Sequence, residues 1–275
     1  MYRTEKLTLY IDIGTNAEIV IGSREWLVCA ACSAGPAFEG GGITHGMRAA
    51  AGAIEDFDLD PLTLEPMLLT IGNQPAIGIC GSGLLIAIAA LFEHGVIDHR
   101  GKFKRNMGTE RIREGRSGYE YVLAWHRDTG GNEDIVLNEV DIENFIRAKG
   151  AIFAGIKTLI EEVGLQLIDI EQIILAGGFG SYIDLDAAMT VGLLPEVAPE
   201  KVIYVGNGSL MGARMSEMSN HIRRDVVEVV HRMTSFELSE VASFKDQYVA
   251  SLFLPHTDMT LFPHHGRRVM QARQP

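Results

Sequence analysis

The sequence has few of the residues that stabilise secreted proteins, bind polyanions or cross a bilayer. Its 275 residues include only three cysteines, too few for a disulfide framework. Lysine and arginine number 24 against 36 aspartates and glutamates, and the net charge of −12 argues against nucleic acid or an anionic membrane as the main partner. The longest apolar run, residues 84–92, is far shorter than the roughly 20 residues that span a bilayer. The first residues, MYRTEKLT, lack the hydrophobic segment of a secretion signal, so we expect a cytoplasmic protein.

Apolar residues make up 47% of the chain, which is enough to build a sizeable core. Apolar and polar residues alternate in three short runs between 7 and 31, and this pattern predicts three antiparallel strands. After a glycine-rich break, apolar residues recur three and four apart from Ile142 to Val163, which predicts a long helix ended by Gly164. A short strand in QIILAGGFGS, a helix around 184–191, a strand at 201–206 and a helix opened at 207–209 are expected to follow.

Three antiparallel strands followed by helix, strand, helix, strand and helix is the order of a ribonuclease-H-like α/β lobe, the building block of actin-like ATPases. We therefore predict a single lobe over residues 1–254, with its core in 7–34 and 139–254. The last residues, 255–275, contain several histidines and arginines and are expected to form a loosely ordered tail.

Residues 35–138 interrupt this order after the third strand, so we interpret them as a large insertion. Within the insertion the pattern predicts one helix near 82–94 and strands at 66–71 and 119–124.

Two glycine-containing motifs lie at the ends of predicted strands. DIGTN, residues 12–16, follows the first strand, and AGGFG, residues 176–180, follows a later one. Ligands of such sheets bind at the carboxyl ends of strands. A carboxylate near a sheet core needs a partner, a metal or water, so Asp12 is a candidate for a functional role.

These motifs resemble a phosphate motif and the adenosine motif of the actin, hexokinase and heat-shock chaperone superfamily of ATP-binding folds. More closely, a set of segments resembles the C-terminal domain of the reductive activators of corrinoid-dependent methyl-transfer proteins. In chain order they are CSAGPAFEGGGITHGMRAAAGAIE, GICGSGL, AKGAIFAGI, ILAGGFGSYID, GLLP and VGNGSLMGA. The ordered series makes the resemblance far more specific than any one short motif. It implies that the chain binds ATP and Mg²⁺, and that ATP drives a conformational change on a corrinoid protein, so that cob(II)amide returns to cob(I)amide.

For DIGTN, the resemblance assigns Mg²⁺ to Asp12, as the catalytic residue, and the phosphates to Gly14, Thr15 and Asn16. A Gly–Thr turn between strands exposes backbone N–H groups that can cradle phosphate oxygens. One carboxylate is sufficient for Mg²⁺ where the nucleotide supplies further oxygens. The same residues also fit a hairpin in which Asp12 accepts hydrogen bonds from the turn amides.

For AGGFG, the resemblance assigns the adenosine to Gly177, Gly178 and Phe179, because glycines let a base and ribose lie against the backbone. A tight turn between strand and helix explains the two glycines equally well. Lys149 continues the apolar face of the long helix, where a charge is unusual. It either reaches the nucleotide or extends its ammonium group to solvent.

Cys29 and Cys32 have the CxxC spacing of redox and metal sites, but residues three apart on a strand point to opposite faces. Cys80 is the only other thiol, and iron–sulfur clusters take four ligands, so we expect no [2Fe-2S] cluster on this chain. Full-length members of the family carry such a cluster in an N-terminal domain, followed by a middle region and a first ATPase lobe with a DIGTT motif. The chain contains none of these, and we expect ferredoxin-like and first-lobe domains in cis or in trans.

Two other functions remain open on the sequence. One is an activator ATPase of another radical or iron–sulfur enzyme, of the 2-hydroxyacyl-CoA dehydratase type, which would need cluster cysteines shared across a dimer. The other is a non-enzymatic actin-like interaction module. We also expect a homodimer, because symmetric self-association is common among soluble domains. The insertion is expected to supply this interface or the contact with the corrinoid protein.

Overall fold

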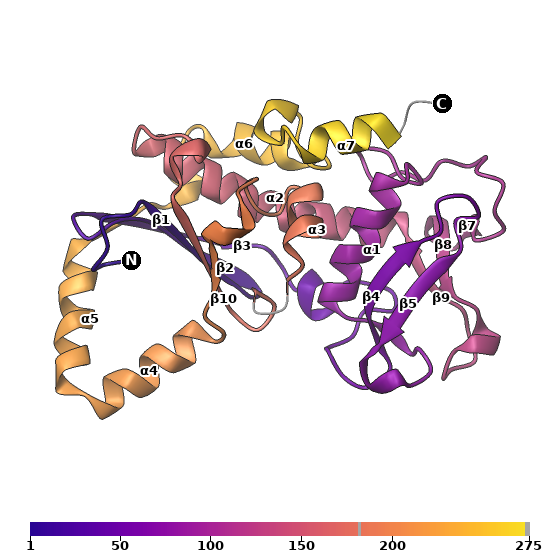
Figure 1. Cartoon of the computed structure of the whole chain (residues 1–275), viewed down its shortest axis with the longest axis horizontal. Coiled ribbons are helices and arrows are strands. Elements are labelled where there is room, and N and C mark those ends of the chain that lie inside the picture. The colour runs from indigo at the N-terminus through magenta and orange to yellow at the C-terminus, as the bar shows by residue number, and fades with distance from the viewer. Residues whose placement is uncertain (181–182, 273–275) are drawn as a thin grey trace.

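A six-stranded mixed sheet organises one half of the chain (Figure 1). The computed structural model describes residues 1–180 and 183–272; Ser181 and Tyr182, which belong to the ILAGGFGSYID segment, lie outside the described residues. An antiparallel meander is formed by β1 (Thr8–Ile13), β2 (Asn16–Gly22) and β3 (Leu27–Ser33). Parallel pairing adds β10 (Gln172–Ala176) to β1, β11 (Val202–Tyr204) to β10, and β12 (Met233–Ser235) to β3. The order β11-β10-β1-β2-β3-β12 contains the strand order of a ribonuclease-H-like lobe.

The alternation of residues in β1 decides which face of this sheet is buried. Leu9, Ile11 and Ile13 are at most 1% exposed, whereas Tyr10 and Asp12 between them are only partly buried. The buried face is covered by α2 (Glu139–Glu162), which packs on β2 and β3. Full burial of each Leu or Ile stabilises the fold by roughly 1.5–3 kcal/mol. We call the opposite face, which carries Tyr10 and Asp12, the outer face.

The residues at the two ends of α2 are suited to starting and stopping a helix. The side chain of Asn138 accepts hydrogen bonds from the backbone N–H groups of Val140 and Asp141, and the Asp141 carboxylate accepts one from the N–H of Asn138. Just beyond the helix, Gly164 has a φ of 73°, the left-handed conformation that glycine adopts most readily. None of the described helices, α2 included, combines the length and apolar character needed to cross a membrane.

The residues between β3 and α2 form a second half with two three-stranded sheets. One has the order β5-β4-β6 and the other β7-β8-β9. The strands are β4 (Ala53–Leu59), β5 (Pro66–Thr70), β6 (Gly78–Ile79), β7 (Ile112–Gly115), β8 (Gly118–Ala124) and β9 (Ile135–Asn138). The helix α1 (Gly81–Glu93) packs on β4. This half holds the predicted helix near 82–94 and the two predicted strands.

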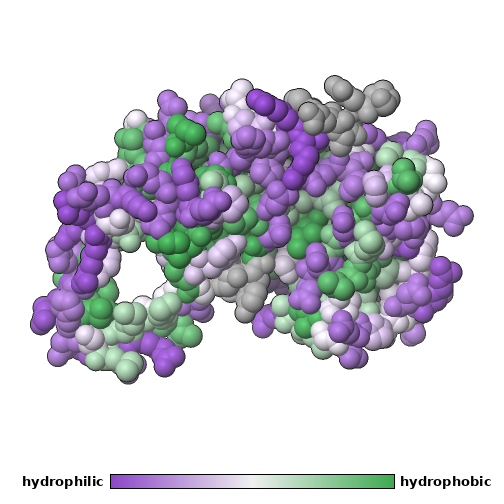
Figure 2. All heavy atoms as spheres, viewed as in Figure 1, coloured by the Kyte–Doolittle hydropathy of each residue, from purple (hydrophilic) through white to green (hydrophobic). Residues whose placement is uncertain are grey.

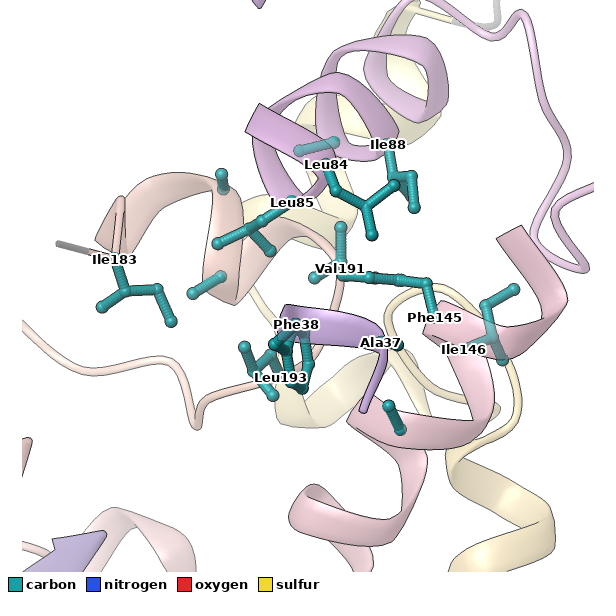
Figure 3. Close-up of a cluster of buried hydrophobic side chains, with 14 of the residues drawn as sticks. Ala37, Phe38, Leu84, Leu85, Ile88, Phe145, Ile146, Ile183, Val191 and Leu193 are labelled. Atoms are coloured by element: carbon teal, nitrogen blue, oxygen red, sulfur yellow. The ribbon is translucent and has the colours of Figure 1, made fainter. Parts of the chain in front are cut away.

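An apolar cluster joins the two halves (Figure 3). It brings together the short 3-10 turn η1 (Ala37–Glu39), α1, α2 and α3 (Leu185–Thr190). The Phe38 ring meets Phe145 of α2 edge to face, with 5.7 Å between centroids. Val191 lies between this pair and Leu84 of α1 (Figure 3). Because η1 is the first turn after β3, the cluster ties the second half to the sheet.

The segment between β11 and β12 extends away from the six-stranded sheet (Figure 1), and it contacts Asp12 through Ser209 and Arg3 through Asp225. It consists of α4 (Gly208–Met218) and α5 (Asn220–Arg232), and neither helix has a buried residue. We call these two helices the arm. The sequence predicts that a helix opens at 207–209, but it does not predict the second helix, the short strand β12 or the separation from the sheet.

The C-terminal segment is part of the folded unit, so the prediction of a loosely ordered tail is wrong for residues 255–268. After α6 (Phe244–Ser251), the ring of Phe262 is fully buried and lies 5.3 Å from that of Phe153. In α7 (His265–Ala272), Arg268 forms ion pairs with Asp186 and Glu93. The composition of this segment is polar, and its order depends on contacts with residues far away in the sequence.

His256, in this C-terminal segment, makes the stability of the protein depend on pH. The residue is 4% exposed, its Nδ1 accepts a hydrogen bond from the backbone N–H of Asp258, and burial lowers the pKa of its imidazole to about 4. An unfolded histidine titrates near 6.5, so the unfolded state binds more protons between these two values. The contribution of His256 to stability is therefore complete above about pH 6.5 and is lost as the pH falls toward 4.

Between pH 7 and pH 4.5 we expect the parent protein to lose about 2.5 kcal/mol of unfolding free energy that the His256→Gln variant does not lose. Denaturant unfolding at the two pH values measures this difference. The control is His221→Gln, which removes a largely exposed imidazole on α5. Equal pH dependence in the parent and the His256→Gln variant would contradict the assignment.

Candidate nucleotide site

The carboxyl ends of β1 and β10 and the loop after β11 meet at one edge of the sheet. In the parallel pair of β1 and β10, Asp12 is aligned with Ala176, the last residue of β10. Just beyond that strand, the N–H of Gly177 donates to the carbonyl of Gly206, at 3.0 Å. The fold thus brings together DIGTN, AGGFG and the residues that open α4, at the position where sheets of this kind bind ligands.

The carboxylate of Asp12 is held by two hydroxyl groups. Tyr10 Oη and Ser209 Oγ donate to the same oxygen, Oδ2, at 3.3 and 3.0 Å. Burial, reinforced by the Asp12 charge, raises the pKa of Tyr10 to about 12, so the phenol remains a donor. In the part of the chain that the structure describes, no lysine or arginine forms an ion pair with Asp12. This leaves the carboxylate oriented and without a cationic partner, as a ligand for a divalent cation requires.

The turn after Asp12 is exposed at Thr15 and Asn16. The N–H of Gly14 donates to the Asn16 carbonyl at 2.9 Å, so it closes the turn and does not point outward for a phosphate. Thr15 donates its hydroxyl to Oε1 of Glu39 at 3.0 Å, and the other oxygen of this carboxylate is buried without a hydrogen-bond partner among the described residues. Glu39 was not predicted as a site residue. It lies in the GPAFEGG segment, and only the fold brings it to the turn.

The two glycines of AGGFG have different surroundings. Gly177 is buried, with a φ of 92°, and a Cβ at this position would lie 2.4 Å from the Ile13 carbonyl oxygen and 2.7 Å from Oδ1 of Asp12. Gly178 is exposed, and a Cβ there would have no atom within 4 Å. Gly177 is thus required for the close approach of β1 and β10, whereas Gly178 offers open backbone for a ligand.

Phe179 connects this edge of the sheet to the second half of the chain. Its ring stacks on that of Phe38, with 4.6 Å between centroids and 19° between planes. Phe38 in turn belongs to the apolar cluster around α1 and α2.

The opening of α4 completes the edge with residues that follow the predicted strand at 201–206 and that the sequence indicated as a helix start. Asn207 accepts the backbone N–H of Leu210 at 2.8 Å, which caps the helix. Gly208 lies against Tyr10, because a Cβ there would be 2.6 Å from the phenol oxygen. Ser209 then follows and reaches Asp12. The signal for this contact was the NGS sequence directly after a strand, but the partner of the serine is 197 residues away.

The structure does not place Lys149 with the other predicted site residues. Its side chain is fully buried, and its ammonium group donates to the backbone carbonyls of Phe253 and Pro255, at 2.5 and 2.6 Å. Burial lowers the pKa of this lysine. The two contacts hold the C-terminal segment against α2. Neither of the two roles that the sequence left open, reaching the nucleotide or extending to solvent, describes this geometry.

Cys29 and Cys32 lie on opposite faces of β3. Cys32 faces the buried side, where burial raises the pKa of its thiol to about 12, and Cys29 faces the outer side. A protonated thiol is a poor metal ligand. We expect no bound iron or zinc in the parent protein or in the Cys29→Ser, Cys32→Ser double variant, as measured by elemental analysis. Stoichiometric metal in the parent that disappears in the double variant but persists in Cys80→Ser would contradict this.

Comparison with known proteins gives concordant matches. A family model described as the C-terminal domain of RACo, the ASKHA domain, matches residues 6–266. The corrinoid activation enzyme RamQ of Eubacterium limosum is 33% identical over 256 residues, which cover 90% of this chain and 42% of that protein. The Co(II) methylated amine-specific corrinoid protein reductase of Methanosarcina barkeri is 29% identical over 267 residues, with coverage of 89% and 45%.

A solved structure, of a reductive activator for corrinoid, iron–sulfur protein, superposes with a TM-score of 0.89 at 50% identity. The match covers 94% of this chain and 41% of that one. The chain therefore spans less than half the length of each of these proteins. The matches confirm the prediction of an actin-like, ribonuclease-H-like fold.

Proposed function

Because the chain belongs to the family of RACo C-terminal ASKHA domains, which have the actin-like ATPase fold, we propose that it is the nucleotide-binding part of a corrinoid reductive activator. In this role it helps to return a corrinoid protein from cob(II)amide to cob(I)amide. The observation that carries the proposal is the continuous match over residues 6–266, which includes the edge of the sheet where Asp12, Gly178 and Ser209 converge. We further propose that it acts in the cytoplasm.

ATP and Mg²⁺ are the ligands that we propose for this edge. The Asp12 carboxylate, oriented by Tyr10 and Ser209, would hold the cation or its waters, and bound Mg²⁺ would neutralise charge on the phosphates. Thr15 and Asn16 would contact the phosphates, and Gly178 would lie under the adenosine. Gly14 and Gly177 would shape the site through the backbone.

The iron–sulfur cluster does not fit this chain. Cys29 and Cys32 lie on opposite faces of β3, and the described residues contain no group of three or more His, Cys, Asp or Glu side chains positioned to hold a metal ion. We propose that the electron carrier belongs to another part of the activator, in cis or in trans. The same observation disfavours an activator of the 2-hydroxyacyl-CoA dehydratase type, which ligates its cluster with shared cysteines.

The contacts of the site support a conformational role for the nucleotide. Thr15 is bonded to Glu39 and Phe179 stacks on Phe38, so both sides of the site contact the turn η1. That turn packs on α1 and α2. Phosphates that take the Thr15 hydroxyl from Glu39 would release one of these contacts. A ligand shifts a conformational equilibrium only through different affinities for the two states, and these contacts offer such a difference.

A reconstitution assay tests the proposed function. A corrinoid protein in the cob(II) state is mixed with a reductant, Mg-ATP and the N-terminal part of a family member, with and without this chain, and cob(I)amide is followed by its absorbance. We expect reduction to require both the chain and ATP. Reduction at the same rate without the chain would refute the proposal. ATP hydrolysis that never leads to cob(I)amide would instead point to an unrelated actin-like ATPase.

The isolated chain is expected to bind Mg-ATP weakly, with a dissociation constant well above micromolar. A two-lobed ATPase surrounds its nucleotide, whereas a single lobe must meet the cost of binding with fewer contacts. Titration calorimetry of the chain with Mg-ATP measures the affinity. Submicromolar binding by the monomer would show that one lobe forms the whole site.

A further inference from the structure

Glu39 brings a carboxylate to the turn of DIGTN without a cationic partner. One of its oxygens, Oε1, accepts the Thr15 hydroxyl at 3.0 Å, and the other, Oε2, is buried without a hydrogen-bond donor among residues 1–180 and 183–272. Within the same ranges no lysine, arginine or histidine forms an ion pair with Glu39. A buried polar atom without a partner costs free energy, so its presence requires an explanation other than stability.

The position of Glu39 does not depend on its hydrogen bond to Thr15. The N–H of Gly35 donates to the Thr15 carbonyl at 3.0 Å, so the backbone alone joins this segment to the turn. Phe38, directly before Glu39, is 4% exposed and belongs to the apolar cluster. The backbone and the cluster therefore fix η1, which leaves the Glu39 carboxylate available for another role.

The candidate site has an open side and an enclosed side. On the open side Ser209 lies at the start of the arm, and an opening separates the arm from the body of the chain (Figure 2). On the enclosed side η1 packs on α1 and α2, and Oε2 of Glu39 is buried there. A carboxylate in such a place can hold a single water molecule away from bulk solvent, where hydrogen bonds are stronger.

We propose that Glu39 is a catalytic residue for ATP hydrolysis, which orients the attacking water and accepts its proton. The inference rests on the proposed function, because it requires ATP beside Asp12. When a phosphate takes the Thr15 hydroxyl, Oε1 of Glu39 loses its donor, and both carboxylate oxygens can then accept hydrogen bonds from the water. Asp12 thus holds the cation, and Glu39 holds the water.

The hydrolytic step is balanced with this carboxylate as the only base. The water oxygen forms a bond to the γ-phosphorus, the bond from this phosphorus to the β–γ bridging oxygen breaks, and ADP leaves with the electron pair. One proton of the water moves to Oε2 of Glu39 and passes afterwards to solvent, so the carboxylate is restored for the next turnover. Phosphoryl transfer depends mainly on positioning and electrostatics, and a fixed carboxylate supplies both to the water.

Glu39→Gln, in a protein that joins this chain to the N-terminal part of a family member, separates this role from a structural one. The amide keeps an oxygen for the Thr15 hydroxyl, so η1 and the turn should stay in place. We expect kcat for ATP hydrolysis to fall by about a hundredfold or more, while the calorimetric affinity for Mg-ATP changes by less than about twofold. The control Glu162→Gln removes an exposed carboxylate at the last residue of α2 and should hydrolyse ATP at the parent rate.

Two further readouts do not respond to a residue that is only structural. Formate should restore part of the hydrolysis lost in Glu39→Ala, because it supplies a carboxylate in the space of the deleted group, and it should have no effect on Glu39→Gln, where the amide fills that space. Mg-ADP with aluminium fluoride imitates the phosphoryl group in transit between ADP and water. Calorimetry should show that Glu39→Gln binds this complex about tenfold or more weakly than the parent does.

Several outcomes would overturn the assignment. Hydrolysis at the parent rate in Glu39→Gln removes the residue from the reaction. Loss of Mg²⁺-dependent ATP binding in this variant would make Glu39 a cation ligand, and a lower unfolding free energy without rescue by formate would make it a structural contact. A parent that forms cob(I)amide while Glu39→Gln hydrolyses ATP normally leaves the proposed function standing, whereas a parent that neither binds nor hydrolyses ATP refutes both.

Discussion

Asp12→Asn is expected to lower ATP hydrolysis by about a hundredfold or more in a protein that joins this chain to the N-terminal part of a family member, because the variant removes the charge that we propose positions the cation at the reacting phosphates. Asparagine keeps the size of the side chain and an oxygen for the hydroxyl groups of Tyr10 and Ser209. The fold should therefore be preserved, and the effect should come from the lost charge alone.

Two further measurements make this result specific. Calorimetry with and without Mg²⁺ should show that the cation strengthens ATP binding in the parent and not in Asp12→Asn. Glu25→Gln serves as the matched control, since it removes an exposed carboxylate at the hairpin between β2 and β3, at the other end of the sheet. Unchanged turnover in Asp12→Asn would remove this residue from the site.

The parts of the fold that could be predicted are those determined by local pattern. Alternation in residues 7–31 was sufficient for the meander, because each strand pairs with its sequence neighbour. The apolar spacing predicted a helix from Ile142 to Val163, and in the structure α2 spans Glu139–Glu162. The position of Asp12 at the carboxyl end of β1 could also be predicted, because it depends only on where the first strand ends and the turn begins.

What could not be predicted depends on contacts across long stretches of sequence. Lys149 lay on the apolar face of its helix, and this position correctly indicates burial, but its carbonyl partners at Phe253 and Pro255 are about a hundred residues later. The order of the C-terminal segment rests on Phe262 packing on Phe153, which no composition reveals. β12 has three residues, Met-Thr-Ser, and pairs with β3 without any strand pattern of its own.

The residues of the candidate site also fall into two groups, those that the sequence indicated and those that it did not. The sequence indicated Asp12 because a carboxylate near a sheet core needs a partner. It indicated Gly177 and Gly178 because two glycines directly follow a predicted strand. Glu39, Tyr10 and Ser209 are ordinary residues in their local segments, and the contacts of Glu39 and Ser209 with Thr15 and Asp12 exist only because distant elements converge. Motifs therefore indicated where the candidate site lies, and the fold shows which side chains orient the Asp12 carboxylate.

Two substitutions at adjacent positions, Gly177→Ala and Gly178→Ala, are expected to differ in their effect on stability, although both should weaken nucleotide binding. At Gly177 the φ of 92° and the overlap of a Cβ with the Ile13 carbonyl oxygen should lower the unfolding free energy by roughly 2–4 kcal/mol. The same Cβ would lie 2.7 Å from Oδ1 of Asp12 and so should displace the carboxylate and weaken nucleotide binding.

At Gly178 a methyl group meets no atom within 4 Å, so the unfolding free energy should change by less than about 0.5 kcal/mol. If the adenosine lies on this backbone, as we propose, the methyl group should nevertheless lower nucleotide affinity by about tenfold, the loss of roughly 1.4 kcal/mol of binding energy. Denaturant unfolding and calorimetry on both variants separate the two roles, because only Gly178→Ala should weaken binding in a protein of unchanged stability. Unaltered affinity in Gly178→Ala would place the base elsewhere, and unaltered stability in Gly177→Ala would show that β1 and β10 can move apart without cost.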